Sequence, residues 1–258
     1  MANISTIDGI AIASVENVDV YAKSAISNIN GYAIPSSGAN VDVEYTFNSQ
    51  TTQETAGSDW SPSGDAGDWV NGADAVSTTF WGQPEDTNDT VKGWNCGQGG
   101  TTSSGTGPNG GVDTSDGSHN TSERYLYTEA SSNQSLKCFV TRMPGSNFSA
   151  VMTSTGNDLD LKFWVHAFGT AGTLPDLFVY IDTNTSSNHG TATLLQTFLG
   201  NDLDNDYTGN SSVWKLKTVS LNSYRTVDAV HYIYFVAQGG SGFRSDLAID
   251  NVIIDEDA

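Results

Sequence analysis

Basic residues are scarce in this sequence, which has 10 Lys and Arg against 30 Asp and Glu and a formal net charge of -20 at pH 7. Nucleic acids and anionic membranes bind proteins through basic patches that release counterions from phosphates. The chain lacks the cations for such a patch, so its composition disfavours both partners. The acidity fits either a surface suited to salty water, where screening shortens repulsion, or acidic loops that hold divalent cations.

Long hydrophobic runs are also missing. No stretch approaches the roughly 20 apolar residues that cross a bilayer, and residues 1–10 lack the basic flank and apolar run of a signal peptide. We therefore expect neither membrane insertion nor export by a cleaved signal. Gly, Ser, Thr and Asn are nonetheless abundant and Lys is rare, as in extracellular proteins. This combination fits a phage protein that is released by lysis, and it predicts a location on the virion surface.

Cysteine occurs only at Cys96 and Cys138, without a CxxC pair. The two residues form either one disulfide or two buried thiols, and the sequence alone does not pair them. A core of the size that this chain can build does not need a disulfide, which favours the thiols.

Recognisable catalytic motifs are missing too. The sequence has no GxSxG elbow, HExxH helix, P-loop or GxGxxG. Asp42 and Glu44 come closest to the carboxylate pair of a glycosidase, but the third member of the usual cluster is absent. The histidines are scattered without zinc-ligand spacing. We expect a non-enzymatic protein, and a polysaccharide depolymerase is the least favoured alternative.

Residues 1–39 contain an 11-residue repeat, which appears when residues 7–17, 18–28 and 29–39 are stacked as IDGIAIASVEN, VDVYAKSAISN and INGYAIPSSGA. The first position is β-branched and the second is Asp or Asn. Asp-Gly and Asn-Gly favour turns because these residues tolerate positive φ, so each unit is predicted to form a turn and a short strand. The repeat positions are Ile7, Asp8, Gly9, Val18, Asp19, Ile29, Asn30 and Gly31.

Three such units cannot bury a core by themselves, so residues 1–39 are predicted to be an anchor that packs against other virion subunits. The alternative is an unstructured tail. The segment resembles the N-termini of tailed-phage structural proteins, in which Ile-Asn-Gly and Ala-Ser-Ile units recur. A Pro, Ser and Gly stretch at 35–40 then leads into a second domain, residues 40–258.

The second domain has the pattern of a β-sandwich. Residues 41–47 alternate between apolar and polar, and residues 48–111 are rich in turn residues and tryptophan. Short apolar segments then follow, separated by polar turns and without helical periodicity, at 124–129, 136–142, 159–167, 176–182, 193–199, 214–220, 230–238 and 247–255. The prediction is an all-β chain: an antiparallel jelly-roll β-sandwich on a short repetitive N-terminal anchoring arm.

From about residue 94 to 255, the order of motifs resembles the MAM domain, an extracellular adhesion module with a jelly-roll fold. The motifs are Gly107-Pro108, Asp113-Thr114, YLYTE at 125–129, LKFWVH at 161–166 followed by Gly169, GTL at 172–174, LFVY at 177–180, WKL at 214–216, YFVA at 234–237 followed by Gly239-Gly240, and DLAIDNV at 246–252. The cysteines depart from the family pattern, and Asn251 replaces a usual second Asp. The resemblance implies self-association or adhesion rather than catalysis.

Calcium is the one cofactor that the sequence suggests, because Ca²⁺ prefers carboxylate and carbonyl oxygens on loops. Residues 201–209 read NDLDNDYTG, with acidic side chains at alternate positions. A second place is implied by resemblance to cation sites in such sandwiches. In both cases the alternative is an ordinary acidic turn. The candidate ligands are Asp202, Asp204 and Asp206 in the first place, and Asp113 with Asp250 in the second.

Tryptophans are candidate ligand-binding residues, because a flat indole stacks on the apolar face of a sugar ring. Trp60, Trp69 and Trp81 flank turns rich in Gly and Asp, which predicts either display at a rim or a role as core filler. Trp164 and Trp214 lie in alternating strands, which predicts core positions.

Together these features predict a phage virion structural protein, on a tail fibre or as a capsid decoration. Its arm would anchor it, and its sandwich would bind a host surface glycan or protein, or neighbouring subunits. Homo-oligomers, trimers in a fibre, would strengthen weak contacts by avidity. The alternative is a cement protein that stabilises the particle without a host ligand.

Overall fold

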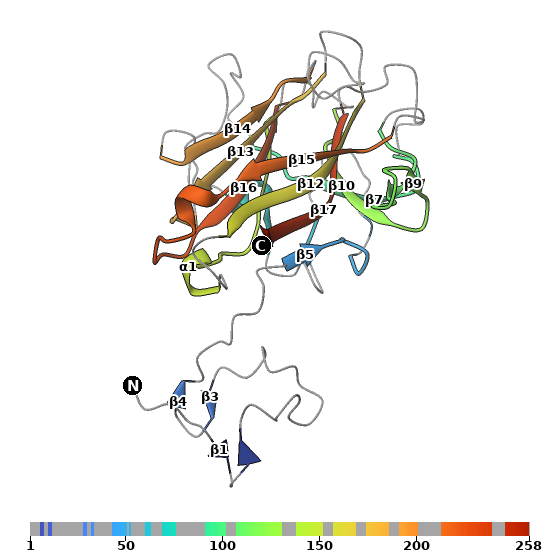
Figure 1. The fold of residues 1–258 in the computed structure, drawn as a ribbon. Helices are drawn as coiled ribbons and strands as arrows, with labels where there is room; N and C mark the ends of the chain where they lie inside the picture. The colour runs from blue at the N-terminus through green and yellow to red at the C-terminus, as the bar shows by residue number, and fades with distance from the viewer. Residues whose placement is uncertain are drawn as a thin grey trace.

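The structure is a computed structural model that describes residues 6–7, 10–11, 28–29, 32–33, 43–50, 52, 60–62, 69–75, 91–101, 107–130, 138–151, 157–168, 174–185, 191–200, 213–238 and 246–257. In these residues the regular secondary structure is almost entirely β, and two large antiparallel sheets pack as a sandwich (Figure 1). The few helical elements are short: η4 (Gly72–Ala75), α1 (Phe148–Val151) and η6 (Asn222–Tyr224). None of them has the length and apolar character needed to cross a bilayer.

The six-stranded sheet follows the order β15-β12-β17-β10-β7, and β5 pairs with β17 beside this path. Its members are β5 (Val43–Tyr45), β7 (Asn95–Gln98), β10 (Arg124–Tyr127), β12 (Asp158–Phe168), β15 (Lys215–Ser220) and β17 (Asp246–Asp257).

The five-stranded sheet follows the order β14-β13-β16-β11-β6. Its members are β6 (Val70–Asn71), β11 (Cys138–Arg142), β13 (Asp176–Asp182), β14 (Thr193–Phe198) and β16 (Tyr232–Gln238). Between β10 and β17 the chain crosses repeatedly from one sheet to the other. The strands β10, β17, β12 and β15 of the first sheet correspond, in that order, to β11, β16, β13 and β14 of the second. This arrangement is a jelly roll, so the predicted fold class is confirmed.

The main core lies between the two sheets because the strands alternate apolar and polar side chains, which point to opposite faces. In β13, Leu177, Val179 and Ile181 are buried, whereas the residues between them are half-exposed. In β12, Leu161 and Phe163 face the same core. The local alternation that predicts these strands therefore also decides which side of each strand becomes the core.

Trp60 and Trp69 belong to this core, and each is 2% exposed. The Trp69 ring stacks on Phe235 with centroids 6.2 Å apart and meets Phe47 edge-on at 5.3 Å. Of the two alternatives for these tryptophans, the structure therefore supports core filler and contradicts display at a rim. The indoles fold inward and supply apolar area to the core.

The remaining tryptophan and cysteine predictions have mixed outcomes. Trp81 lies outside the described residues. Trp214 is 1% exposed, as predicted, whereas Trp164 is only half-buried and packs on a smaller cluster around Trp214. Cys96 in β7 and Cys138 in β11 are both buried and form no disulfide with each other, which confirms the favoured prediction of two buried thiols.

Two small hairpins form in the N-terminal arm. β1 (Thr6–Ile7) pairs with β2 (Ile10–Ala11) through Ile7 and Ile10, and β3 (Asn28–Ile29) pairs with β4 (Tyr32–Ala33) through Ile29 and Tyr32. The same register thus recurs at equivalent repeat positions. These strands join neither large sheet within the described residues. The other predicted anchor positions, Asp8, Gly9, Val18, Asp19, Asn30 and Gly31, lie outside those residues.

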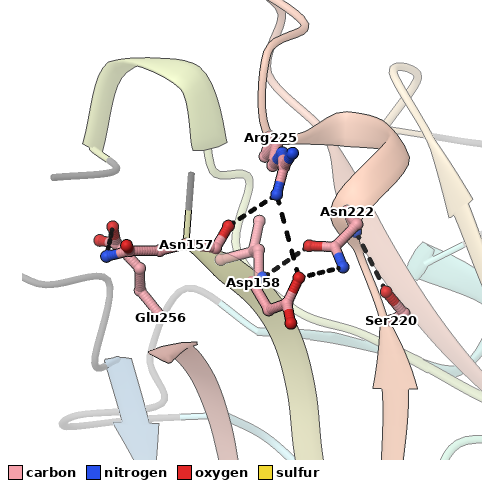
Figure 2. A network of polar contacts seen from close by, with 7 residues as sticks. Asn157, Asp158, Ser220, Asn222, Arg225 and Glu256 are labelled. Carbon is pink, nitrogen blue, oxygen red and sulfur yellow. Dashed lines mark hydrogen bonds and ion pairs between the residues drawn. The ribbon is translucent and has the colours of Figure 1, made fainter. Parts of the chain in front are cut away.

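A polar network joins the start of β12 to the turn that follows β15 (Figure 2). The Asn222 side chain accepts a hydrogen bond from the Leu159 N–H and donates one to Asp158, both at 2.8 Å. Arg225 donates to the Asn157 carbonyl at 2.8 Å, and the Asn157 amide donates to Glu256 of β17 at 2.7 Å. These contacts satisfy backbone groups at a sheet end, so the network has a structural role.

Candidate functional sites

A polar hollow of about 180 Å³ opens where β5 and β17 meet the segment that carries β8 (Gly111–Val112) and β9 (His119–Asn120). We call it the acidic hollow. None of the described residues that line it is basic. They are Glu44, Thr46, Asn48, Val112, Thr114, Glu123, Asp250 and Asn251.

A β-bulge in β17 shapes this hollow. Lys162 of β12 pairs with Ile253 and Trp164 pairs with Asp250, so Phe163 faces two residues of β17. Asn251 has a φ of 46°, in the left-handed region that Asn tolerates better than most residues. Neighbouring side chains of a regular strand point to opposite faces. The bulge instead lets Asp250 and Asn251 line the same hollow.

Asp250 is the buried group of the hollow, with 2% of its surface exposed. Its Oδ2 accepts a hydrogen bond from the Val112 N–H at 2.8 Å, and its Oδ1 accepts one from the Asn251 N–H at 2.7 Å. Burial raises the pKa of Asp250 well above its ordinary value, and the charges of Glu123 and Glu44 raise it further, against the opposing effect of the two backbone hydrogen bonds.

The other two carboxylates of the hollow bind amides rather than cations. Glu44 accepts a hydrogen bond from the Asn251 side chain, and Glu123 accepts one from the Asn48 side chain. An amide donor satisfies a carboxylate oxygen but adds no positive charge. Three acidic side chains therefore share a site without a basic residue in the described part of its lining, and such a site favours a proton or a bound cation.

The predicted calcium ligands are placed as follows. Asp250 lines the hollow, whereas Asp113 does not, although its neighbours Val112 and Thr114 do. Asp113 instead accepts hydrogen bonds from the hydroxyl and N–H of Ser115, which lower its pKa. Within the described ranges, no group of three Asp, Glu, His or Cys side chains is arranged to hold a metal ion. Asp202, Asp204 and Asp206 lie outside those ranges, and calcium binding stays a prediction.

Sequence reasoning missed Glu44 and Glu123 as members of this site. The sequence pattern indicates only a glycosidase-like pair of Glu44 with Asp42. Its partner Asn251 lies 207 positions away in the sequence, and Glu123 precedes a different strand. No local signal joins these segments, since the contacts depend on the pairing of β5 with β17.

A second candidate site is the outer face of the five-stranded sheet, which carries a group of aromatic side chains. Phe178 and Tyr180 of β13 and Tyr232 of β16 are half-buried there, and Tyr234 is fully buried beside them. We call this set the aromatic face. Tyr180 lies opposite Tyr234 in the strand register, so the two share one face of the sheet.

Polar contacts hold the aromatic face in place. The Arg142 guanidinium lies over the Tyr232 ring at 4.9 Å from its centroid and donates to the carbonyl of Thr185. The Tyr234 hydroxyl donates to the carbonyl of Asn184 at 2.6 Å. Burial raises the pKa of Tyr180, so its phenol stays protonated at neutral pH. Fixed rings beside hydrogen-bonding groups are suited to stacking on a sugar and binding its hydroxyls.

The aromatic face is covered at one end and open at the other. Ala75 of η4 packs into the cluster beside β11. On the β14 side, Leu194 pairs with Tyr180 and is 47% exposed. The sequence signal for this face is the aromatic pair at alternate positions, in FVY at 178–180 and YIY at 232–234. Sugar stacking is predicted from the sequence for the tryptophans and not for these residues.

Comparisons with known proteins give likenesses of fold only. No family model and no curated protein matches the chain. The K1 cleaved adhesin domain of Lys-gingipain from Porphyromonas gingivalis is 14% identical with a TM-score of 0.44, over 84% of this chain and 99% of that domain. The K2 cleaved adhesin domain of Lys-gingipain is 13% identical with a TM-score of 0.46, over 83% of this chain and 97% of that domain. A carbohydrate-binding module specific for non-crystalline cellulose is 9% identical with a TM-score of 0.38, over 73% of this chain and 88% of that module.

Proposed function

We propose that this chain is a non-catalytic binding module of a phage virion, and that the aromatic face of its jelly roll binds a polysaccharide on the host surface. The observation that carries the proposal is the set of half-exposed rings of Phe178, Tyr180 and Tyr232 on one sheet face. Rings on paired strands are already ordered, so they lose little conformational freedom when a ligand stacks on them.

The electrostatics of the chain narrow the class of polymer. A formal net charge of -20 repels anionic polymers at low ionic strength. The aromatic face itself offers phenols and the Arg142 guanidinium beside apolar ring surface. An uncharged polysaccharide matches both features, because its rings present apolar faces to the aromatics and hydroxyls to the polar groups.

The arm supports the virion part of the proposal. Its two hairpins repeat one register, and an isolated two-stranded hairpin is at best marginally stable in water. Other virion subunits would supply the surface on which such hairpins become stable. In this arrangement the virion holds residues 1–39, and the MAM-like sandwich, residues 40–258, is presented at the virion surface.

Titration of the full chain with neutral polysaccharides, followed by calorimetry, tests the binding site. Tyr180→Ala should weaken binding about tenfold, which corresponds to about 1.4 kcal/mol of lost ring contact. Tyr180→Phe is the matched control, because it keeps the ring and should bind nearly as well as the wild type. Equal binding by the wild type and Tyr180→Ala would contradict the proposed binding site. Release of reducing sugar from the polysaccharide would show that the chain is a depolymerase and not a non-catalytic module.

A further inference from the structure

β14 is the edge strand of the five-stranded sheet, and within the described residues it pairs only with β13. Most of its side chains are exposed or half-exposed, including Leu194 at 47%, and Leu199 directly after the strand is 49% exposed. The outer side of an edge strand presents backbone N–H and C=O groups that can pair with another strand.

The usual protection of an edge strand is weak in β14. Residues 190–201 contain no Asp, Glu, Lys, Arg or Pro. By contrast, β15 at the edge of the other sheet carries Lys215 and Lys217, the kind of residue that discourages edge pairing. One bulge interrupts β14 opposite Val179 and Tyr180, and it leaves the residues from Gln196 to Phe198 in regular register.

We infer that β14 pairs antiparallel with β14 of a second copy of this chain. An antiparallel pair of identical strands is self-complementary about a twofold axis, which is the commonest symmetry of homo-oligomers. Two chains with a net charge of -20 repel each other, so a contact between copies is most favourable on an uncharged segment. The strand at 193–198, with exposed Leu194, provides that segment.

This pairing joins the aromatic faces of the two copies. Leu194 lies beside Tyr180 and Thr197 lies beside Phe178 in the β13–β14 register, so both face the same side as the aromatic rings. The two five-stranded sheets become one continuous sheet, with the two aromatic faces next to each other. If the proposed function holds, one polymer strand then contacts both copies and gains avidity.

Sedimentation of the full chain over a range of concentrations tests the pairing. The wild type should show a concentration-dependent dimer, and Leu194→Lys should weaken the association at least about tenfold, because it places a charge on the uncharged pairing strand of each copy. Leu216→Lys on β15 is the matched control, since Leu216 is 50% exposed on the other edge, and it should leave the dimer unchanged.

Two results would overturn the inference: a wild type that stays monomeric well above micromolar concentration, or an oligomer that Leu194→Lys leaves intact. Circular dichroism checks that Leu194→Lys is folded. If it is not, Gln196→Lys replaces it in the sedimentation experiment, because Gln196 is also exposed on β14. Binding of a short oligosaccharide to single chains is measured separately. If single chains do not bind the oligosaccharide, the proposed ligand is refuted but the dimer is not. If the chain binds the oligosaccharide but stays monomeric, the pairing is refuted but the proposed ligand is not.

Discussion

The backbone N–H of Val112 donates a hydrogen bond to Oδ2 of Asp250 at 2.8 Å, although the two residues are 138 positions apart. This bond fastens β8 to β17 and closes the acidic hollow on one side. It also fixes a buried carboxylate near two other acidic side chains, which gives the hollow a defined response to pH.

Stability should depend on pH through Asp250. Its pKa is raised in the folded chain by burial and by the charges of Glu123 and Glu44. The folded state therefore holds the proton more tightly than the unfolded state does. The resulting stabilisation is fully present below the ordinary Asp pKa of about 3.9 and is lost as the pH rises through the raised pKa. We expect the contribution of Asp250 to the free energy of unfolding to increase as the pH falls from neutral.

Urea unfolding of the wild type and of Asp250→Asn over this pH range measures the effect. The variant should be less stable throughout, because an amide nitrogen would face a backbone donor, but it should lack this pH-dependent gain. Asp113→Asn is the control, because the contribution of Asp113 to stability should change with pH in the opposite direction. Hydrogen bonds from Ser115 lower the pKa of Asp113. Its stabilisation is present above the ordinary pKa and is lost as the pH falls. Parallel curves for the wild type and Asp250→Asn would contradict the role of Asp250.

Gly111→Ala should destabilise the fold by about 1–3 kcal/mol, the usual cost of forcing extra atoms into a packed site. A Cβ at Gly111 would lie 2.6 Å from Cβ of Glu123 and 2.7 Å from Oδ2 of Asp250. Gly100→Ala is the matched control, because its added Cβ would meet only Asn109 Oδ1, at an ordinary 3.7 Å. Chemical denaturation compares the two variants, and equal stability would show that the hollow tolerates the added methyl group.

Trp69→Ala should cost about 3–5 kcal/mol of stability, as expected for removal of a large buried aromatic. The indole is 2% exposed and contacts Phe235 and Phe47, so its loss leaves a cavity in the main core. Polysaccharide binding per folded molecule should not change. Thermal unfolding and calorimetry on the same sample separate the two effects. A variant with normal stability but lost binding would instead place Trp69 in the ligand site.

The fates of Trp69 and β13 show what the sequence predicts well and what it does not. The alternation at 176–182 predicts a strand, and β13 spans Asp176–Asp182, because strand formation and facing depend on a local period of two. The turn residues around Trp69 do not show that its indole packs in the core, and the short strand β6 that begins directly after it has no alternating pattern of its own. The acidic hollow is harder still, because Glu44, Glu123 and Asp250 meet only through distant strand pairing and a bulge.

Calcium should raise the melting temperature if the acidic hollow accepts a cation in place of the proton on Asp250. A ligand that binds only the folded state stabilises it by about 2.7 kcal/mol at one hundred times its dissociation constant. The hollow offers carboxylate and amide oxygens, which are the ligands that Ca²⁺ prefers, but its three acidic side chains are not grouped around one ion position in this structure. Binding requires Glu44 and Glu123 to exchange their amide hydrogen bonds for the ion.

Calorimetric melting with calcium, with magnesium and with a chelator measures this effect. Glu44→Gln and Glu123→Gln should each remove most of the calcium-dependent rise, because each loses one charged ligand. Asp116→Asn, at an exposed position outside the hollow, should keep the rise. Magnesium should act more weakly, since it demands stricter octahedral geometry and gives up its water reluctantly. If calcium and chelator leave the melting temperature of the wild type unmoved, the acidic hollow does not bind calcium and this prediction is wrong.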